Sequence, residues 1–281
     1  MQYYFRTTSY AVMKNAIKFG IAGAIVIAII ASSTPYSILG TDILGGGNDT
    51  TATNTQTSEQ DTLRIGYFPN INHAQAVIGL GRGDFQNALG DNIEVTTQIF
   101  NAGPSAIEAL FANQIDVTYI GPNPAINGYV QSNGEALRII SGSTSGGAVF
   151  VVRNDSGINS PQDLANKKFS SPQLGNTQDV ALRKYLLDNG YRTQENGGNI
   201  EIIPAKTADI VSLMIKKDID GAWLTEPWGA KLIKDTNARV LVDERDLWPN
   251  GQFVTAHIIA RTDYIEKNPD IIKKLLGAHV D

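Results

Sequence analysis

The regular alternation of strand-like and helix-like segments from Thr62 onward is the feature that most limits the folds open to this chain. The strand-like run LRIGYF is followed by the helical pattern HAQAVIGLGRGDF and then by the strand-like IEVTTQIF. The alternation continues through AVFVV and VALRKYLLDNG to IEIIP, and Thr207 is a reasonable N-cap for the helical pattern ADIVSLMIKK. Such alternation is typical of α/β proteins with helices on both faces of parallel sheets. We therefore predict an α/β fold built on parallel sheets.

A long-range repeat indicates two similar halves. Residues 107–125, IEALFANQIDVTYIGPNPA, align with residues 210–229, IVSLMIKKDIDGAWLTEPWG, with one extra residue in the second copy. Both copies run from a helix through Ile-Asp into a short strand and then a proline-rich loop. The simpler explanation is that any two helix–strand units of an α/β protein look alike. If the copies instead belong to two facing lobes, the lobes enclose a cleft, because ligands in open α/β sheets bind beyond the carboxyl ends of the strands.

Composition and residue spacing exclude several functional classes. The net charge of −5 gives no basic field to attract nucleic acid. The chain has no cysteine, which excludes disulfides, thiolate metal sites, a cysteine nucleophile and a lipid anchor on cysteine. The three histidines are widely scattered and no His/Asp/Glu cluster has ligand spacing, so we expect no enzyme activity, no metal and no cofactor. IGLGRGD resembles a nucleotide-binding loop, but it follows a helix rather than a strand, and we interpret it as a helix C-terminus.

The first sixty residues differ in composition from the rest. Lysines precede the apolar run Phe19–Ala31, and no charge follows it until Asp42. Such a run suits a secretory signal, and the longer uncharged stretch around it could span a bilayer as an uncleaved anchor. We predict a signal peptide or membrane anchor over residues 1–40 and a flexible linker over residues 41–61. Either alternative places the rest of the protein outside the cytoplasm, secreted or tethered to the outer face of the cell membrane.

Five motifs occur in a recognisable order between Leu63 and the C-terminus. They are GYFPNINHAQAVIGLGRGDF, NAGPSAIEALFANQIDVTYIGPNPA, SPQDLANKK with the Gly-Asn-Thr-Gln-Asp segment after it, AWLTEPWGAKL and LWPNGQFVTAHIIAR. In this order they resemble the extracytoplasmic substrate-binding proteins of ABC importers, in the nitrate, sulfonate and taurine branch. The resemblance implies a type II periplasmic-binding fold, in which two doubly wound lobes are joined by two crossover strands.

The resemblance also implies domain boundaries and partners. Residues 62–150 and 252–281 are expected to form the first lobe, and residues 151–251 the second. The family continues with further helices, whereas this sequence ends inside a helical pattern, so we expect a truncated C-terminus. We expect a monomer that captures a small anionic solute (an alkanesulfonate, taurine, nitrate or a similar compound) and delivers it to an ABC permease in the membrane.

The predicted ligand site is centred on a segment that opens a helix. Residues 175–178, GNTQ, offer hydrogen-bond donors with no acid before Asp179, which suits an external anion because helix N-termini carry unpaired N–H groups and partial positive charge. Asn176 or Thr177 could instead cap its own helix, and the two roles are compatible for different atoms. The predicted ligand-binding residues are Asn70, His73, Pro104, Ser105, Gly121, Asn123, Ser145, Gly146, Asn176, Thr177, Gln178, Glu226 and Trp228.

Some of these residues have alternative roles. An acid such as Glu226 is unfavourable beside an anion, so it either bonds an amine on the ligand or braces its loop from outside the pocket. Trp228 either packs in the core or stacks on the ligand. Ser145 and Gly146 lie beside the first crossover, where small residues allow hinge motion and close backbone approach. The alternative function is a binding protein for, or an enzyme acting on, a thiamine-precursor pyrimidine held by Trp228 and Glu226.

Overall fold

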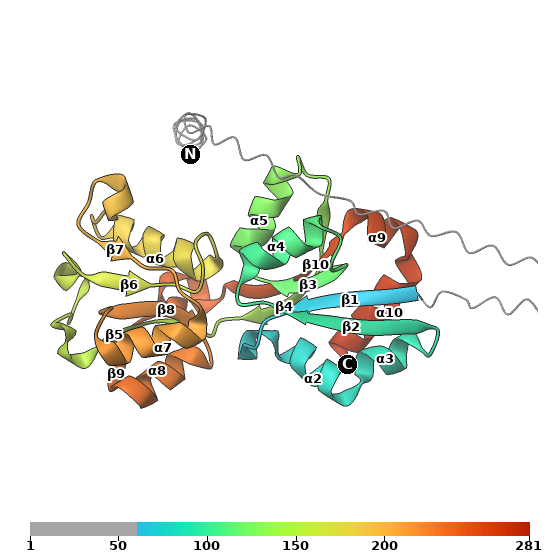
Figure 1. The fold of residues 1–281 in the computed structure, drawn as a ribbon, viewed down its shortest axis with the longest axis horizontal. Helices are drawn as coiled ribbons and strands as arrows, with labels where there is room; N and C mark the ends of the chain where they lie inside the picture. The colour runs from blue at the N-terminus through green and yellow to red at the C-terminus, as the bar shows by residue number, and fades with distance from the viewer. Residues whose placement is uncertain (1–60) are drawn as a thin grey trace, which may run out of the picture. The chain divides into compact units, whose positions relative to one another are not determined.

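The computed structural model describes residues 61–281, and these contain two five-stranded sheets (Figure 1). The predictions for the signal or anchor segment and for the linker up to residue 60 lie outside the described residues. The first sheet has the order β2-β1-β3-β10-β4 and the second the order β7-β6-β8-β5-β9. We call the first sheet and the helices that pack on it lobe 1, and the second sheet and its helices lobe 2.

Lobe 1 contains β1 (Asp61–Tyr67), η1 (Ile71–His73), α2 (Ala74–Arg82), α3 (Asp84–Leu89), β2 (Ile93–Ile99), α4 (Gly103–Phe111), β3 (Val117–Ile120), α5 (Pro122–Gln131), β4 (Leu137–Ser145), β10 (Val254–Arg261), α9 (Thr262–Lys267) and α10 (Pro269–Val280). Lobe 2 contains β5 (Ala148–Arg153), η2 (Asn154–Ser156), η3 (Pro161–Asp163), β6 (Lys168–Ser170), α6 (Thr177–Asp188), η4 (Gln194–Asn196), β7 (Glu201–Ile202), α7 (Thr207–Lys216), β8 (Gly221–Thr225), α8 (Trp228–Thr236), β9 (Ala238–Asp243), η5 (Glu244–Leu247) and η6 (Pro249–Gly251).

The two sheets have the same topology, position by position. In the order of each sheet, β2, β1, β3, β10 and β4 correspond to β7, β6, β8, β5 and β9. The sequence repeat falls on equivalent units, since its first copy covers α4, β3 and α5 and its second covers α7, β8 and α8. The interpretation of the repeat as two similarly built halves is therefore confirmed.

The predicted parallel strands are present in both sheets, but each sheet also contains one strand that runs the other way. In lobe 1, β1 is parallel to β2 and β3, whereas β10 is antiparallel to β3 and β4. In lobe 2, β5 is antiparallel to β8 and β9. Both β5 and β10 arrive from the opposite lobe, so they enter their sheet at the edge where the parallel strands end. An alternating sequence pattern carries no sign of such a crossing.

Helices cover both faces of each sheet, which gives each lobe two apolar cores. In lobe 1, Phe85 and Leu275 pack on one face and Ile107 packs on the other; Figure 1 shows α4 and α5 opposite α2 and α3. In lobe 2, Leu182 of α6 packs on one face and Ile210 of α7 on the other. Burial of each such side chain is worth about 1.5–3 kcal/mol. The doubly wound α/β class is therefore confirmed, and its rigid sheets position the loops at their edges.

The helix boundaries correct two further predictions. The expected proline-rich loop after β3 is the first turn of α5, which begins at Pro122; a proline is accepted there because its missing N–H has no intrahelical partner. Thr207 is the first residue of α7 rather than its N-cap, which is Lys206. By contrast, IGLGRGD is confirmed as a helix C-terminus, since α2 ends at Arg82 and Gly83 adopts a left-handed φ of 77°. Within residues 61–281, no helix has the length and apolar character needed to cross a bilayer.

Candidate functional site

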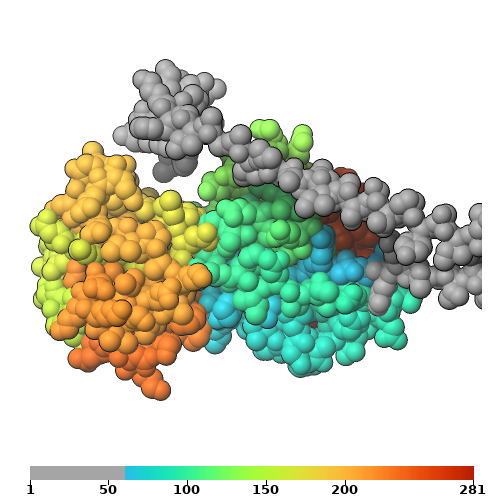
Figure 2. All heavy atoms as spheres, viewed as in Figure 1, coloured from blue at the N-terminus to red at the C-terminus, as the bar shows by residue number. Residues whose placement is uncertain are grey.

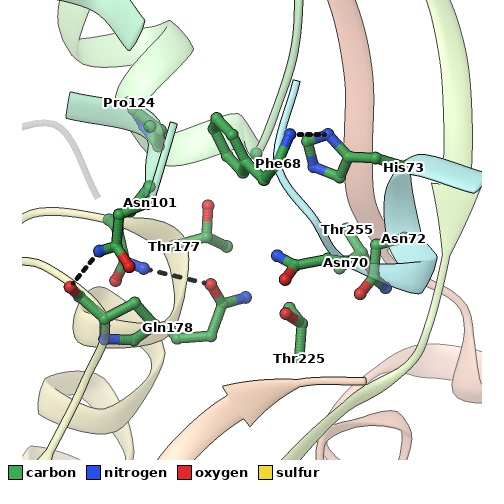
Figure 3. A pocket seen from close by; sticks show the side chains of 15 residues that line it. Phe68, Asn70, Asn72, His73, Asn101, Pro124, Thr177, Gln178, Thr225 and Thr255 are labelled. Carbon is green, nitrogen blue, oxygen red and sulfur yellow. Dashed lines mark hydrogen bonds between the residues drawn. The ribbon is translucent and has the colours of Figure 1, made fainter. Parts of the chain in front are cut away.

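A small cavity lies where the two lobes meet. Figure 2 shows atoms of lobe 1 (blue to green) and lobe 2 (yellow to orange) meeting directly on the face drawn. The cavity volume is about 20 Å³, and about 10–15 Å³ is the least that holds one water. The lining comes from Phe68, Asn70, Asn72, His73, Asn101, Ala102, Gly103, Gly121, Pro124 and Thr255 of lobe 1 and from Pro172, Asn176, Thr177, Gln178 and Thr225 of lobe 2 (Figure 3).

Three helix N-termini converge on this cavity. The N-cap residues of α4, α5 and α6 are Ala102, Gly121 and Asn176, and all three line it. The first turns of α4 and α5 contain no acid, and neither helix has a side-chain cap. The first turn of α6 contains Asp179, but its carboxylate is held by Ser171 Oγ at 2.8 Å and by Arg183 Nε at 2.9 Å. The aligned N–H groups and helix dipoles therefore favour negative charge inside the cavity.

The segment that opens α6 is buried and has two roles. Asn176 Oδ1 accepts a hydrogen bond from the Asp179 backbone N–H at 2.7 Å, so Asn176 caps its own helix. Its Nδ2 lies 3.4 Å from Gln178 Oε1. Thr177 Oγ1 is buried without a hydrogen-bond partner. The predicted capping role thus occupies the Asn176 oxygen, and the bond to Gln178 uses one amide N–H, which leaves the second for a ligand.

Asn70 and His73 present neutral groups at the carboxyl end of β1. The Trp228 indole donates to Asn70 Oδ1 at 3.0 Å, which orients the Asn70 amide so that its NH₂ group is the end left for a ligand. The Phe68 backbone N–H donates to His73 Nδ1 at 3.2 Å, so the ring proton belongs on Nε2. Burial lowers the pKa of His73 to about 3. His73 is therefore a neutral donor, not a cation, at physiological pH.

Asn72 contributes an acceptor. Its Nδ2 donates to the Gly146 carbonyl at 3.0 Å, at the point where the chain crosses from β4 to β5. The direction of this bond fixes Oδ1 as the other end of the amide, and Oδ1 is buried without a partner. A buried acceptor without a partner costs about 1–3 kcal/mol. A ligand that donates a hydrogen bond to Asn72 would remove that cost.

Six of the thirteen predicted ligand-binding residues line the cavity: Asn70, His73, Gly121, Asn176, Thr177 and Gln178. The other seven, Pro104, Ser105, Asn123, Ser145, Gly146, Glu226 and Trp228, lie outside its lining.

Several of these seven residues support the cavity from behind. Glu226 Oε2 accepts from the Ala230 backbone N–H at 3.0 Å, and therefore braces the start of α8. Ser145 Oγ accepts from the Phe253 backbone N–H at 3.3 Å, which ties the two crossing segments together. Gly146 has a left-handed φ of 79°, a conformation that favours glycine. Trp228 acts on the cavity through Asn70.

Nine lining residues are not among the thirteen predicted ligand-binding residues: Phe68, Asn72, Asn101, Ala102, Gly103, Pro124, Pro172, Thr225 and Thr255. Most of them stand at or directly after the carboxyl end of a parallel strand, as Asn101 does after β2, so the strand-end rule could have found them. Thr255 is different, because it lies near the start of an antiparallel strand.

The cavity is uncharged. None of its fifteen lining residues is Lys, Arg, Asp or Glu, and His73 is neutral. In the part of the chain that the structure describes, no group of three or more His, Cys, Asp or Glu side chains could hold a metal ion. The cavity therefore offers amides, hydroxyls, a neutral imidazole and helix N-termini to a ligand.

Sequence comparison finds relatives among binding proteins. The model of the NMT1-like family matches residues 56–281. A Brucella abortus protein described as a binding protein is 27% identical over 186 residues, which are 66% of this chain and 55% of that protein. The taurine-binding periplasmic protein of Escherichia coli is 24% identical over 182 residues, 65% of this chain and 54% of its own. The chain thus spans about half the length of these curated relatives.

Solved structures with the same fold are also binding proteins. The alkanesulfonate-binding protein of Xanthomonas axonopodis pv. citri, bound to MOPS, superposes with a TM-score of 0.66 at 20% identity, covering 78% of this chain and 71% of that one. The periplasmic nitrate-binding protein of Synechocystis PCC 6803 gives a TM-score of 0.65 at 18% identity, covering 79% and 60%. At these identities the likeness shows the fold alone, which is that of periplasmic binding proteins.

Proposed function

Because the chain belongs to the NMT1-like family, we propose that it is an extracytoplasmic solute-binding protein of an ABC importer and captures a small oxyanion-bearing solute between its lobes. The relatives and structural neighbours named for taurine, alkanesulfonate and nitrate support this proposal. They are transport proteins, which also supports a role in binding rather than catalysis. The proposal includes the sequence-based expectations of an ABC permease as partner, a monomer, and a location outside the cytoplasm.

The convergence of three helix N-termini on one uncharged cavity carries the proposal. One exposed helix terminus is worth about 0.3–1 kcal/mol to an anion, and about 2 kcal/mol when partly buried. Micromolar capture needs about 8 kcal/mol. One terminus is insufficient, whereas the first turns of α4, α5 and α6, together with the Asn70 amide and His73, act on the same small volume.

The size and chemistry of the cavity narrow the solute class. A volume of about 20 Å³ holds little more than one water, so the lobes must move apart to admit a solute, and a compact solute requires the smallest movement. The partnerless Asn72 Oδ1 favours a solute that also carries an N–H donor. A short amino-substituted oxyanion such as taurine carries both a compact anionic group and an N–H donor, whereas nitrate carries no N–H donor. The pyrimidine alternative loses its expected contacts, because Glu226 and Trp228 lie outside the lining.

A matched set of solutes tests this proposal. Thermal-shift and calorimetric titrations of the full chain would compare taurine with ethanesulfonate, which lacks the amine, and with nitrate, sulfate, methylphosphonate and a thiamine-type pyrimidine. We expect taurine to stabilise the protein most, ethanesulfonate to bind more weakly, and the pyrimidine to have no effect. Stabilisation by the pyrimidine alone would contradict the solute class, and turnover of any of these compounds by the pure protein would contradict a binding role.

A further inference from the structure

Helix α7 begins in lobe 2 without a cap of its own. Its N-cap residue, Lys206, makes no side-chain capping bond. The first N–H groups of a helix need an acceptor from outside the helix. The Thr207 backbone N–H finds one in lobe 1, since it donates to Asn101 Oδ1 at 3.1 Å. The start of α7 is thus capped by a side chain of the opposite lobe.

Asn101 uses both ends of its amide on lobe 2. Its Nδ2 donates to the Pro172 carbonyl, which follows β6, at 2.8 Å; the dashed line at Asn101 in Figure 3 marks this bond. Its Oδ1 accepts from the Thr207 backbone, and the Thr207 hydroxyl adds a longer contact of 3.4 Å. One side chain therefore joins lobe 1 to two separate segments of lobe 2.

Because Asn101 lies far from the crossing segments, its bonds strongly resist opening of the lobes. Asn101 follows β2, the edge strand farthest in sheet order from β10 and β4, and the crossing segments connect to these two strands. Other bonds between the lobes lie closer to the crossing, since Ile71 N donates to Glu226 O at 3.1 Å and the Trp228 indole donates to Asn70 Oδ1 at 3.0 Å. In the helix that follows Asn101, Ser105 Oγ adds a longer contact of 3.4 Å with Gln173 Oε1 of lobe 2. When one lobe rotates relative to the other about the crossing segments, Asn101 and Thr207 move farther apart than Ile71 and Glu226 do.

We propose that Asn101 is an inter-lobe latch, which supplies from lobe 1 the N-cap that α7 lacks and thereby favours the closed arrangement of the lobes. Replacing an N-cap Asn by Ala changes a folding equilibrium by about 2- to 30-fold. We expect the closed-to-open ratio to fall by a factor in that range without the latch. A solute that is held only between closed lobes then binds more weakly by up to the same factor; this last consequence rests on the proposed function.

The chain allows each half of the latch to be removed separately. Asn101→Ala removes the acceptor for Thr207 together with the bond from Asn101 Nδ2 to Pro172. Thr207→Pro removes the donor at the first helical position, where proline is favoured. Lys206 has a polyproline-like φ of −56° and ψ of 140°, which a following proline accepts. Thr207→Val is the matched control, because it keeps the backbone N–H and the branched side chain.

Inter-lobe distance is the decisive measurement and needs no solute. Because the chain has no cysteine, spin labels on Glu108→Cys of α4 and Lys184→Cys of α6 report the distance between the lobes. Both positions are exposed. With labels in place, we expect Asn101→Ala and Thr207→Pro to populate longer distances, with helix content unchanged, and Thr207→Val to resemble the parent. Parent-like distances in both latch variants would overturn the proposal.

Taurine titration separates a latch from a ligand contact, since Asn101 lines the cavity and Thr207 does not. Weakening by both Asn101→Ala and Thr207→Pro supports the latch. Weakening by Asn101→Ala alone would overturn it, because Asn101 would then act by touching the solute. If taurine does not bind the parent protein, the proposed solute class fails, and the distance measurement still decides the latch.

Discussion

Gly121 of lobe 1 and Thr177 of lobe 2 approach so closely that a Cβ atom on Gly121 would lie 2.2 Å from Thr177 Oγ1. The same atom would lie 3.2 Å from Thr177 Cβ and 3.4 Å from the carbonyl oxygen of Thr255. Gly121 has an ordinary φ of −75°, so its backbone conformation suits any residue. The close approach of the two lobes, rather than the turn, is what requires glycine at this position.

We expect Gly121→Ala to weaken taurine binding at least tenfold, because the added methyl group holds the lobes apart and exposes the bound anion to water. Calorimetric titration measures the affinity, and urea unfolding checks that both lobes stay folded. Gly142→Ala is the matched control: Gly142 lies in β4 of lobe 1, and a Cβ there meets nothing within 4 Å. Parent-like affinity in Gly121→Ala would show that the lobes do not close this far around the solute.

Two substitutions at Asn176 separate capping from solute binding. Asn176→Asp keeps the acceptor that caps α6 and suits the helix dipole, but it puts a negative charge into the cavity. Asn176→Ala loses the cap, which costs about 1 kcal/mol. We expect both variants to bind taurine at least tenfold more weakly, and only Asn176→Ala to lose stability in urea unfolding. Retained binding by Asn176→Asp would argue against an anionic solute.

The carboxylate of Asp116 holds the far end of the lobe 1 sheet, away from the cavity. Arg64 contacts it through Nε at 2.8 Å and Nη2 at 2.6 Å, and Arg261 Nη1 lies 3.7 Å away. Asp116 is fully buried. We expect Asp116→Ala to lower the free energy of unfolding by about 3–5 kcal/mol, because it leaves two guanidinium groups without their buried partner.

The control for Asp116 is Asp263→Ala. Asp263 also pairs with Arg261, at 3.0 Å, but its side chain is half-exposed. A surface pair of this kind contributes about 1 kcal/mol or less. Urea denaturation compares the two variants, and taurine titration at low denaturant should give parent-like affinity for both. Equal destabilisation by the two substitutions would contradict the assignment of Asp116 as the structural anchor.

The sequence predicts those site residues whose position follows only from where a strand ends or a helix begins. A parallel strand ends at one edge of its sheet, so residues directly after it, such as Asn70 and Gly121, must lie near that edge. The donors at 176–178 are likewise visible as a helix start. These inferences need no knowledge of side-chain direction, and the structure places all of these residues on the cavity.

The sequence fails where a role depends on an atom from the other lobe. Nothing local shows that the Trp228 indole bonds to Asn70, 158 residues away, or that Asn101 caps α7, 106 residues away. For Glu226 the sequence left two roles open, and the structure shows the bracing one, because its carboxylate accepts from the Ala230 N–H. Thr255 escapes the strand-end rule because β10 runs in the opposite direction.

Acid should destabilise the protein through its buried histidines. Burial lowers the pKa of His257 to about 4 and that of His73 to about 3, whereas a histidine in the unfolded chain titrates near 6.5. Between these values the unfolded chain binds protons that the folded protein does not, so the free energy of unfolding decreases as the pH falls from about 6.5 toward 4. Each histidine accounts for about 2 kcal/mol between pH 7 and pH 5.

His257→Leu tests this pH dependence, because it removes one of the two buried histidines. It also removes a buried Nε2 that has no hydrogen-bond partner. Urea denaturation of the parent and the variant at pH 7 and pH 5 gives four free energies of unfolding. We expect the loss on acidification to be smaller in the variant by about 2 kcal/mol. Since carboxylates titrate alike in both proteins, the difference isolates His257. Equal losses in the two proteins would mean that the His257 ring accepts a proton in the folded state as readily as in the unfolded chain.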